Sequence, residues 1–158
     1  MVVSIIVTTK DRPELLKRAL KSVHNQTYKD YEVIVVDDCS DDLVELPASD
    51  DYIRIIRHEV NKGLSAARNT GIKAAKGEYI VCLDDDNELL TTFLEETVPI
   101  LDEDYFDAVT GKRIIRYKNF EDCVKPNVGK FMSIDWGWLI RKEVFDEIQY
   151  DESLRANE

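Results

Sequence analysis

The stretch VSIIVTTKDRPELLKRALKSVHNQTYKDYEVIVVDD, residues 3–38, contains a strand, a helix and a second strand in succession. Residues 3–8 are apolar and rich in β-branched side chains, which is typical of a central strand covered on both faces. Residues 12–25 place apolar side chains on one helical face, and residues 31–36 repeat the pattern of the first strand. Asp11 and Glu14 have capping-box spacing, which predicts Asp11 as the helix N-cap.

The alternation of strands and helices continues along the chain. Residues 52–57 and 78–83 predict two further strands, and residues 64–75 between them predict a helix of small side chains. Residues 37–51 show no clear period and are expected to form a loop. This pattern predicts an α/β fold with a mostly parallel, Rossmann-like sheet and helices on both faces.

The pattern weakens after residue 86. Thr92 and Glu95 have the spacing of a second capping box before an apolar helix, which Pro99 would kink or shorten. We expect strands in residues 108–117 and 131–141 and a short helix in residues 142–148. The 158 residues fit a single domain, 1–158.

Composition excludes some classes of partner. The chain has 21 Lys and Arg against 32 Asp and Glu, a net charge of −11, so a nucleic acid partner is not expected. The three cysteines, Cys39, Cys82 and Cys123, are widely spaced, which favours reduced thiols and therefore a cytoplasmic protein. Peripheral association with a membrane is a further expectation. Cys82 lies in an apolar run and is expected to be buried in the core. The apolar residues 2–7 are too short to span a membrane, so no transmembrane segment is expected. The sequence does not predict an oligomeric state.

Polar residues follow three of the predicted strands: Thr8 and Thr9, Asp37 and Asp38, and the run 84–86, Asp-Asp-Asp. In open α/β sheets ligands bind beyond the carboxyl ends of the strands. Three adjacent carboxylates repel one another unless a cation compensates them. Oxygen ligands without His or Cys suit Mg²⁺ or Mn²⁺, which retain coordination positions for phosphate oxygens.

Both acidic groups also have an ordinary structural interpretation. Residues 84–86 could form an acidic turn that caps the following helix. Asp37 and Asp38 could form a strand-end turn with Ser40. The occurrence of acidic residues at two strand ends favours a binding site, but neither alternative is excluded by the sequence.

Residues 3–42, VSIIVTTKDRPELLKRALKSVHNQTYKDYEVIVVDDCSDD, and residues 61–89, NKGLSAARNTGIKAAKGEYIVCLDDDNEL, resemble glycosyltransferase family 2, which has the GT-A fold. The resemblance implies transfer of a sugar, with inversion, from a nucleoside-diphosphate sugar, most readily a UDP-sugar, to a carbohydrate or lipid-linked acceptor. It also implies Mg²⁺ or Mn²⁺ as cofactor. Residues 1–90 would be the nucleotide-sugar-binding half, and residues 91–158 an incomplete start of the acceptor-side half.

The resemblance also implies roles for individual residues. Asp38 would hydrogen-bond the base, and Asp84-x-Asp86 would be the metal motif, with Asp86 the main ligand and Asp84 the second. Asp85 would face the ribose or the sugar. For Arg68 a structural ion pair is an alternative to nucleotide binding. The remaining residues implied at the nucleotide pocket are Thr8, Thr9, Lys10, Asp11, Asn61, Gly63 and Asn69.

Three further positions bear on the resemblance. Relatives often carry an aromatic residue where this chain has Lys10, so the base preference is less defined here. Trp136 and Trp138 lie where family members begin the acceptor side, and a Trp face can stack on a sugar ring, although core packing is the favoured role for at least one of them. Family members place an acidic general base further along, and Glu158 is the candidate for that catalytic residue in this chain.

Other classes of protein fit the residues at the strand ends less well than a glycosyltransferase does. Phosphotransfer domains place acidic residues after the first strand, whereas this first strand ends in Thr8 and Thr9. A nucleotidyltransferase needs a Gly-rich, basic loop there, and TTKDRPE, residues 8–14, is not such a loop. A nucleotidyltransferase-like protein and a non-catalytic nucleotide-sugar-binding domain are the alternatives that stay open.

Overall fold

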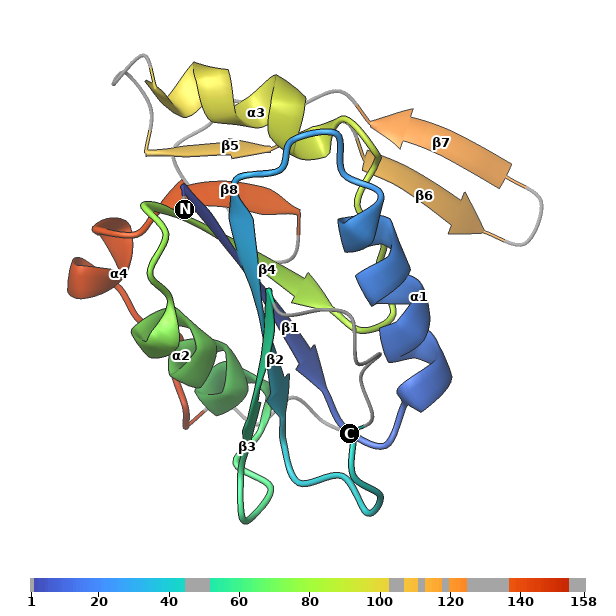
Figure 1. Ribbon diagram of the computed structural model, residues 1–158, viewed down its shortest axis with the longest axis vertical. Helices are drawn as coiled ribbons and strands as arrows, with labels where there is room; N and C mark the ends of the chain where they lie inside the picture. Colours follow the sequence, from blue (N-terminus) through green and yellow to red (C-terminus); the bar gives the residue numbers. More distant parts are fainter. Residues whose placement is uncertain are drawn as a thin grey trace.

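The computed structural model describes residues 2–44, 52–102, 107–110, 113–117, 120–124 and 137–153, with backbone alone in 113–117 and 120–124. The chain forms an α/β fold (Figure 1). Its strands are β1 (Val3–Thr9), β2 (Tyr31–Asp37), β3 (Ile53–Arg57), β4 (Tyr79–Asp84), β5 (Ala108–Thr110), β6 (Arg113–Tyr117), β7 (Phe120–Val124) and β8 (Trp138–Arg141). Its helices are α1 (Pro13–His24), α2 (Leu64–Ala74), α3 (Phe93–Asp102) and α4 (Val144–Glu147).

The main sheet has the strand order β3-β2-β1-β4-β8-β5. Strands β3, β2, β1 and β4 are parallel, whereas β8 pairs antiparallel with both β4 and β5. The predicted, mostly parallel sheet is therefore confirmed. The register pairs Thr9 with Asp37 and Thr8 with Asp84, so the carboxyl ends of β1, β2 and β4 meet at one edge. Strands β6 and β7 form a separate antiparallel pair.

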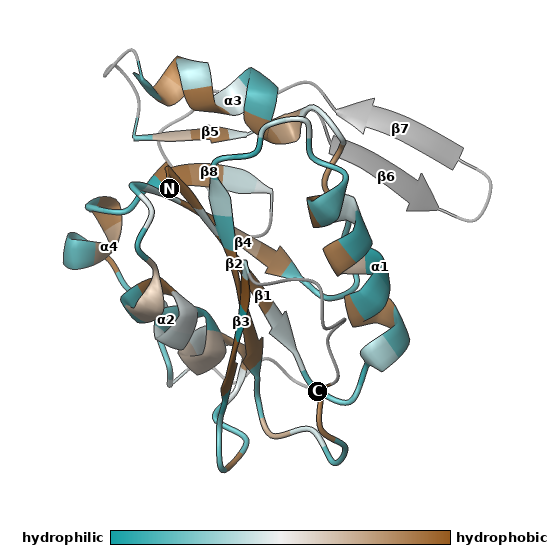
Figure 2. Ribbon diagram, in the orientation of Figure 1, coloured by the Kyte–Doolittle hydropathy of each residue, from teal (hydrophilic) through white to brown (hydrophobic). Residues whose placement is uncertain are grey.

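Helices cover both faces of the sheet, with α1 and α3 on one side and α2 and α4 on the other (Figure 1). Because strand side chains alternate between faces, Val3, Ile5 and Val7 pack under α1 and α3, whereas Ile6 packs under α2. The central strands are apolar, and the helices turn their polar faces outward (Figure 2). Complete burial of each of these Val and Ile side chains contributes about 1.5–3 kcal/mol.

The predicted N-cap at Asp11 is wrong, because tertiary partners take its polar groups. Arg12 occupies the N-cap position of α1 without a side-chain capping bond. Asp11 instead adopts a positive φ of 55°, and its Oδ1 accepts a hydrogen bond from the Asp41 N–H at 2.6 Å. Its own N–H donates to Ser40 Oγ at 2.9 Å. The loop after β1 is therefore tied to the loop after β2 rather than closed on its own helix.

The second half of the chain departs further from expectation. The side chains of the second predicted capping box bond elsewhere: Thr92 donates to Glu96 at 2.6 Å, and Glu95 accepts from Thr27 at 2.5 Å. Pro99 lies inside α3, and the helix nonetheless continues to Asp102. Two strands, β5 and β6, replace the single strand predicted for residues 108–117, and β7 was not predicted. Strand β8 matches part of the strand predicted for 131–141, of which 131–136 lie outside the described residues.

Candidate functional site

The carboxyl ends of β1, β2 and β4 bring the predicted polar residues to one edge of the sheet. Thr8 and Thr9 are buried at the end of β1, between the acids that end the two neighbouring strands. The Thr9 hydroxyl donates to Asp85 Oδ2 at 2.8 Å, and the Asp38 N–H donates to the Thr9 carbonyl at 2.9 Å. The first strand therefore ties the two acidic strand ends together.

Asp38 is buried, and three groups of the protein hold its carboxylate. Oδ1 accepts from the Lys62 N–H at 2.9 Å and lies 2.7 Å from His58 Nδ1. Oδ2 accepts from the Gly63 N–H at 2.7 Å. Gly63 has a φ of 89°, where an L side chain would be strained, and this turn aims two successive N–H groups at one carboxylate. Asp38 thus fixes the entry to α2.

Asp37, although it is also buried, is engaged in a different network. Its Oδ1 accepts from both the N–H and the hydroxyl of Ser40, at 2.9 and 2.6 Å. Its Oδ2 forms an ion pair with Arg57 Nη1 at 2.8 Å. These contacts match the strand-end turn considered for this pair. Asp37 therefore shapes the loop, and of the two acids Asp38 is the better candidate for a ligand.

Asp84 forms an ion pair with Arg68 of α2. Arg68 Nη2 donates to both carboxylate oxygens, at 2.7 and 3.0 Å, and the guanidinium lies 5.1 Å from the centre of the Tyr150 ring. The Thr8 hydroxyl makes a longer hydrogen bond of 3.4 Å to Asp84. The structural alternative considered for Arg68 is thus realised in this state of the protein, and it occupies the carboxylate expected to be the second metal ligand.

Asp85 is buried beside Thr9, and Arg12 of the loop before α1 approaches its Oδ1 at 3.4 Å. Burial raises the pKa of this carboxyl, while the Thr9 hydrogen bond and the Arg12 charge oppose the shift. The side chain points back into the protein toward β1. Its contact with ribose or sugar stays a prediction.

Asp86 is the exposed member of the acidic run. Half of its side chain is accessible, Oδ2 lies 3.8 Å from Arg12 Nη1, and Oδ1 accepts from Asn87 Nδ2 at 2.9 Å. Arg18 of α1 donates to the Asp86 carbonyl at 2.8 Å, which holds the turn in place. Asp86 therefore offers an accessible carboxylate at the carboxyl end of β4, flanked by two arginines.

Among the described residues, no group of three or more His, Cys, Asp or Glu side chains is arranged to hold a metal ion. The donor set nevertheless fits a hard cation that takes one protein carboxylate, from Asp86, and completes its shell with phosphate oxygens and water. Asp84 could act as a second ligand of the cation only if its ion pair with Arg68 were broken. The residues fit Mg²⁺ or Mn²⁺ in this limited sense.

The other predicted site residues fall into two groups. Asn61 is exposed and its Oδ1 accepts from the Gly63 N–H at 3.0 Å, so it supports the same turn as Asp38. Lys10 Nζ lies 3.4 Å from Asp11 Oδ2 in an ion pair directly after β1. Trp138 is half-buried against the core under α2 and α4. Trp136 and the predicted base Glu158 lie outside the described residues.

Two residues have roles that the sequence did not reveal. His58 was not identified as a site residue from the sequence. It follows β3 directly, and this position at the carboxyl end of a parallel strand, like that of the other site residues, could have indicated its role. Asn69 was assigned to the nucleotide pocket, but its Nδ2 donates to the Tyr150 carbonyl and to Glu152 Oε1, both at 2.9 Å, while its Oδ1 accepts from the Tyr150 N–H. Asn69 therefore docks the segment after α4 onto α2.

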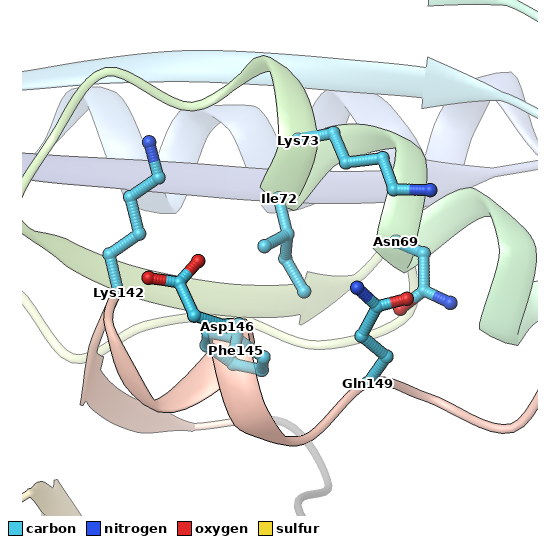
Figure 3. A pocket seen from close by; sticks show the side chains of 7 residues that line it. All are labelled: Asn69, Ile72, Lys73, Lys142, Phe145, Asp146 and Gln149. Atoms are coloured by element: carbon cyan, nitrogen blue, oxygen red, sulfur yellow. The ribbon is translucent and has the colours of Figure 1, made fainter.

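A cavity of about 260 Å³ lies between α2 and α4 (Figure 3). It is lined by Asn69, Ile72, Lys73, Lys142, Phe145, Asp146 and Gln149. None of the strand-end hydroxyl or carboxylate groups lines it, and Lys142 Nζ donates to the Ala75 carbonyl at the end of α2. We place the functional site at the strand ends, where charged and polar groups of four elements converge.

Comparison with known proteins assigns the family. The family model described as "Glycosyl transferase family 2" matches residues 4–150. The chain belongs to this family. This agrees with the sequence resemblance and with the observed fold, in which acidic residues end the second and fourth parallel strands.

Relatives of the family 2 chain include a GalNAc(5)-diNAcBac-PP-undecaprenol beta-1,3-glucosyltransferase of Campylobacter jejuni, 38% identical over 108 residues, covering 65% of this chain and 35% of the relative. Staphylococcus aureus TarS 1-349, solved in complex with UDP-GlcNAc, superposes with a TM-score of 0.75 at 22% identity, covering 93% of this chain and 47% of that chain. The mannosyltransferase PcManGT from Pyrobaculum calidifontis, solved in complex with GDP-Man and Mn²⁺, superposes with a TM-score of 0.62 at 27% identity. The match covers 70% of this chain and 35% of PcManGT. The chain thus spans less than half of each.

The structural likeness to TarS confirms the GT-A fold for this family 2 chain. Within the described residues, no helix has both the length and the apolar character needed to cross a bilayer.

Proposed function

We propose that this family 2 chain is the donor-binding part of a glycosyltransferase that uses a nucleoside-diphosphate sugar, with UDP as the nucleotide. The observation that carries the proposal is the pairing of two different carboxylates at one sheet edge. Asp38 is buried and rigidly held, whereas Asp86 is accessible. A buried, oriented acceptor suits recognition of a base, and an accessible carboxylate suits a hydrated divalent cation.

The geometry of Asp38 bears on the choice of base. Uracil carries an N–H donor at N3 and guanine carries one at N1, whereas the corresponding ring nitrogen of cytosine is an acceptor. A carboxylate therefore favours uracil or guanine over cytosine. UDP-GlcNAc is bound by TarS and GDP-Man by PcManGT, which supports this pair of bases. Our choice of UDP follows the sequence resemblance.

The reaction we propose is inverting transfer to a hydroxyl of a carbohydrate or lipid-linked acceptor; the glucosyltransferase of Campylobacter jejuni supports a polyprenol-linked acceptor. Glu158 is the proposed base that accepts the hydroxyl proton as the oxygen attacks the anomeric carbon. Mg²⁺ or Mn²⁺, when bound, would supply positive charge to the departing diphosphate. Asp86 would hold that ion, and Thr9 and Arg12 would keep Asp85 turned away from the diphosphate.

Calorimetric titration with UDP, with and without Mn²⁺, tests the proposal. We expect Mn²⁺ to strengthen UDP binding to the parent chain, and Asp86→Ala to lose most of that gain, because the cation would lose the carboxylate that holds it beside the diphosphate. Glu14→Ala is the matched control, since it removes an exposed carboxylate of α1 that, among the described residues, pairs with Lys17. Failure of the parent chain to bind UDP or GDP would overturn the proposed function. Full retention of the Mn²⁺ gain in Asp86→Ala would overturn only the ligand assignment.

A further inference from the structure

His58 is a buried imidazole that bridges two elements of the site. It follows β3 directly, its side chain is 4% exposed, and its Nδ1 lies 2.7 Å from Asp38 Oδ1. On the opposite side of the ring, Nε2 lies 2.9 Å from the Thr70 hydroxyl of α2. The His58 N–H also donates to the Asp37 carbonyl at 2.9 Å, so the backbone on which the ring sits is fixed.

The partners of the ring determine its hydrogen-bond roles. An ionised carboxylate only accepts, so Nδ1 carries the hydrogen that faces Asp38. In the neutral ring Nε2 is then an acceptor, and the Thr70 hydroxyl donates to it. His58 thus presents a directed donor to Asp38, and α2 holds the ring in the orientation that aims it.

The hydrogen bond from His58 fills one of the acceptor positions of the Asp38 carboxylate. A carboxylate oxygen accepts about two hydrogen bonds. Oδ1 is filled by His58 and the Lys62 N–H, whereas Oδ2 has one described partner, the Gly63 N–H. One acceptor position therefore stays open on Oδ2, and the carboxylate plane is fixed by donors on both oxygens.

We propose that His58 is a positioning residue for nucleotide binding, which saturates Oδ1 of Asp38 and so directs the single open acceptor position on Oδ2 to the N–H of a uracil or guanine base. This inference rests on the proposed function. Without His58 the two backbone N–H groups would still hold the carboxylate, but each oxygen would keep one open acceptor position. A base N–H could then be accepted at Oδ1 or at Oδ2, and competition between the two poses would lower affinity for the productive one.

Two isosteric substitutions separate the two contacts of the ring. In His58→Asn the side-chain amide nitrogen takes the place of Nδ1, which keeps a donor for Asp38 and loses Thr70. In His58→Gln the amide reaches the place of Nε2, which keeps a partner for Thr70 and loses the donor for Asp38. Thr70→Val removes only the hydroxyl that aims the ring. Each single change removes one side-chain hydrogen bond of the bridge.

Calorimetric titration with UDP, paired with thermal melts, is the test. We expect His58→Gln to weaken UDP binding about tenfold and His58→Asn to stay within about threefold of the parent, since one hydrogen bond to a charged group is involved. The melting temperatures of the two variants should fall by similar amounts. Affinities that fall equally in both variants, or an unchanged affinity in His58→Gln, would overturn the positioning role.

A measurement on the unsubstituted protein keeps the proposal testable if His58→Gln does not fold. In ¹⁵N-labelled protein, the Nδ1–H resonance of His58 should be protected from solvent exchange and should shift when UDP binds, because the Asp38 carboxylate that accepts this hydrogen bond gains a further donor on Oδ2. Binding of UDP with no change in that resonance would overturn the inference while leaving the proposed function standing. If the parent protein binds neither UDP nor GDP, both the positioning role of His58 and the proposed function are overturned.

Discussion

Replacement of Arg68 by Met should leave the carboxylate of Asp84 without its ion-pair partner and so destabilise the protein. The Arg68 side chain is 10% exposed and that of Asp84 is 22% exposed, and Nη2 lies 2.7 Å from Oδ1. Met keeps the length and apolar stem of the side chain but removes its charge and its donors. Asp84 would then retain the long hydrogen bond from Thr8 as its described side-chain contact.

The magnitude follows from the distance and the burial. At an effective dielectric constant of about 20, opposite charges at this separation attract by about 6 kcal/mol, and desolvation of both groups offsets much of it. Removal of one partner of a buried pair typically costs about 3–5 kcal/mol, and the residual exposure of Asp84 places Arg68→Met at the lower end, about 3 kcal/mol. Asp84→Asn in the Arg68→Met background should recover about 2 kcal/mol, because no unpaired charge is left.

Urea denaturation of the parent, the two single variants and the double variant gives this coupling as a thermodynamic cycle. If the losses in unfolding free energy of the two single variants sum to the loss of the double variant to within about 0.5 kcal/mol, the ion pair is not the source of the destabilisation. The same variants bear on the metal. If Arg68 occupies a carboxylate that a cation could take, Mn²⁺ should stabilise Arg68→Met more than the parent, and equal stabilisation would show that Asp84 does not bind metal.

Three further outcomes are expected. Gly71→Ala should lower stability by about 1–3 kcal/mol, since the added Cβ would lie 2.3 Å from Ile6 Cγ2, and the loss measured by urea denaturation should shrink in an Ile6→Ala background. Burial raises the pKa of Asp85, so its ionised form costs stability at neutral pH and the cost fades as pH falls through the folded-state pKa. Asp85→Asn should therefore raise the melting temperature at pH 7, with a gain that diminishes on acidification; a gain independent of pH would contradict this cause. Burial raises the pKa of the Cys82 thiol to about 11, so a thiol reagent at pH 8 should label Cys39 well before Cys82, as mapped by mass spectrometry, and equal rates would show that the native core is open.

The sequence predicted the parallel part of the fold because its signals are local. Residues 3–8 and 31–36 are mostly apolar, with Ser4, Thr8 and Glu32 as the polar exceptions, and a strand buried on both faces accommodates such runs well. The acids at 37–38 and 84–86 then meet because parallel strands end at the same edge. The buried position predicted for Cys82 is also confirmed.

Other features depend on partners that are distant in sequence. Asp11 matched a capping box, but Ser40 and Asp41 compete for its polar groups and appear only once β1 and β2 are paired. The antiparallel direction of β8 follows from which edge of the sheet it joins, and residues 138–141 do not encode that choice. His58 was missed because its two partners lie 20 and 12 residues away, on different elements.

The place of β8 in the sheet has a consequence for synthesis of the chain. The four parallel strands are all available once residue 84 has been made, but β8 pairs with β4 through contacts such as Tyr79 with Arg141. Until that later segment emerges, one edge of β4 exposes unpaired N–H and carbonyl groups beside the apolar residues 79–83. An edge of this kind can recruit a strand from another nascent chain. Pairing with β8 removes this edge, and we expect the risk of such association to last until residues 138–141 have been made.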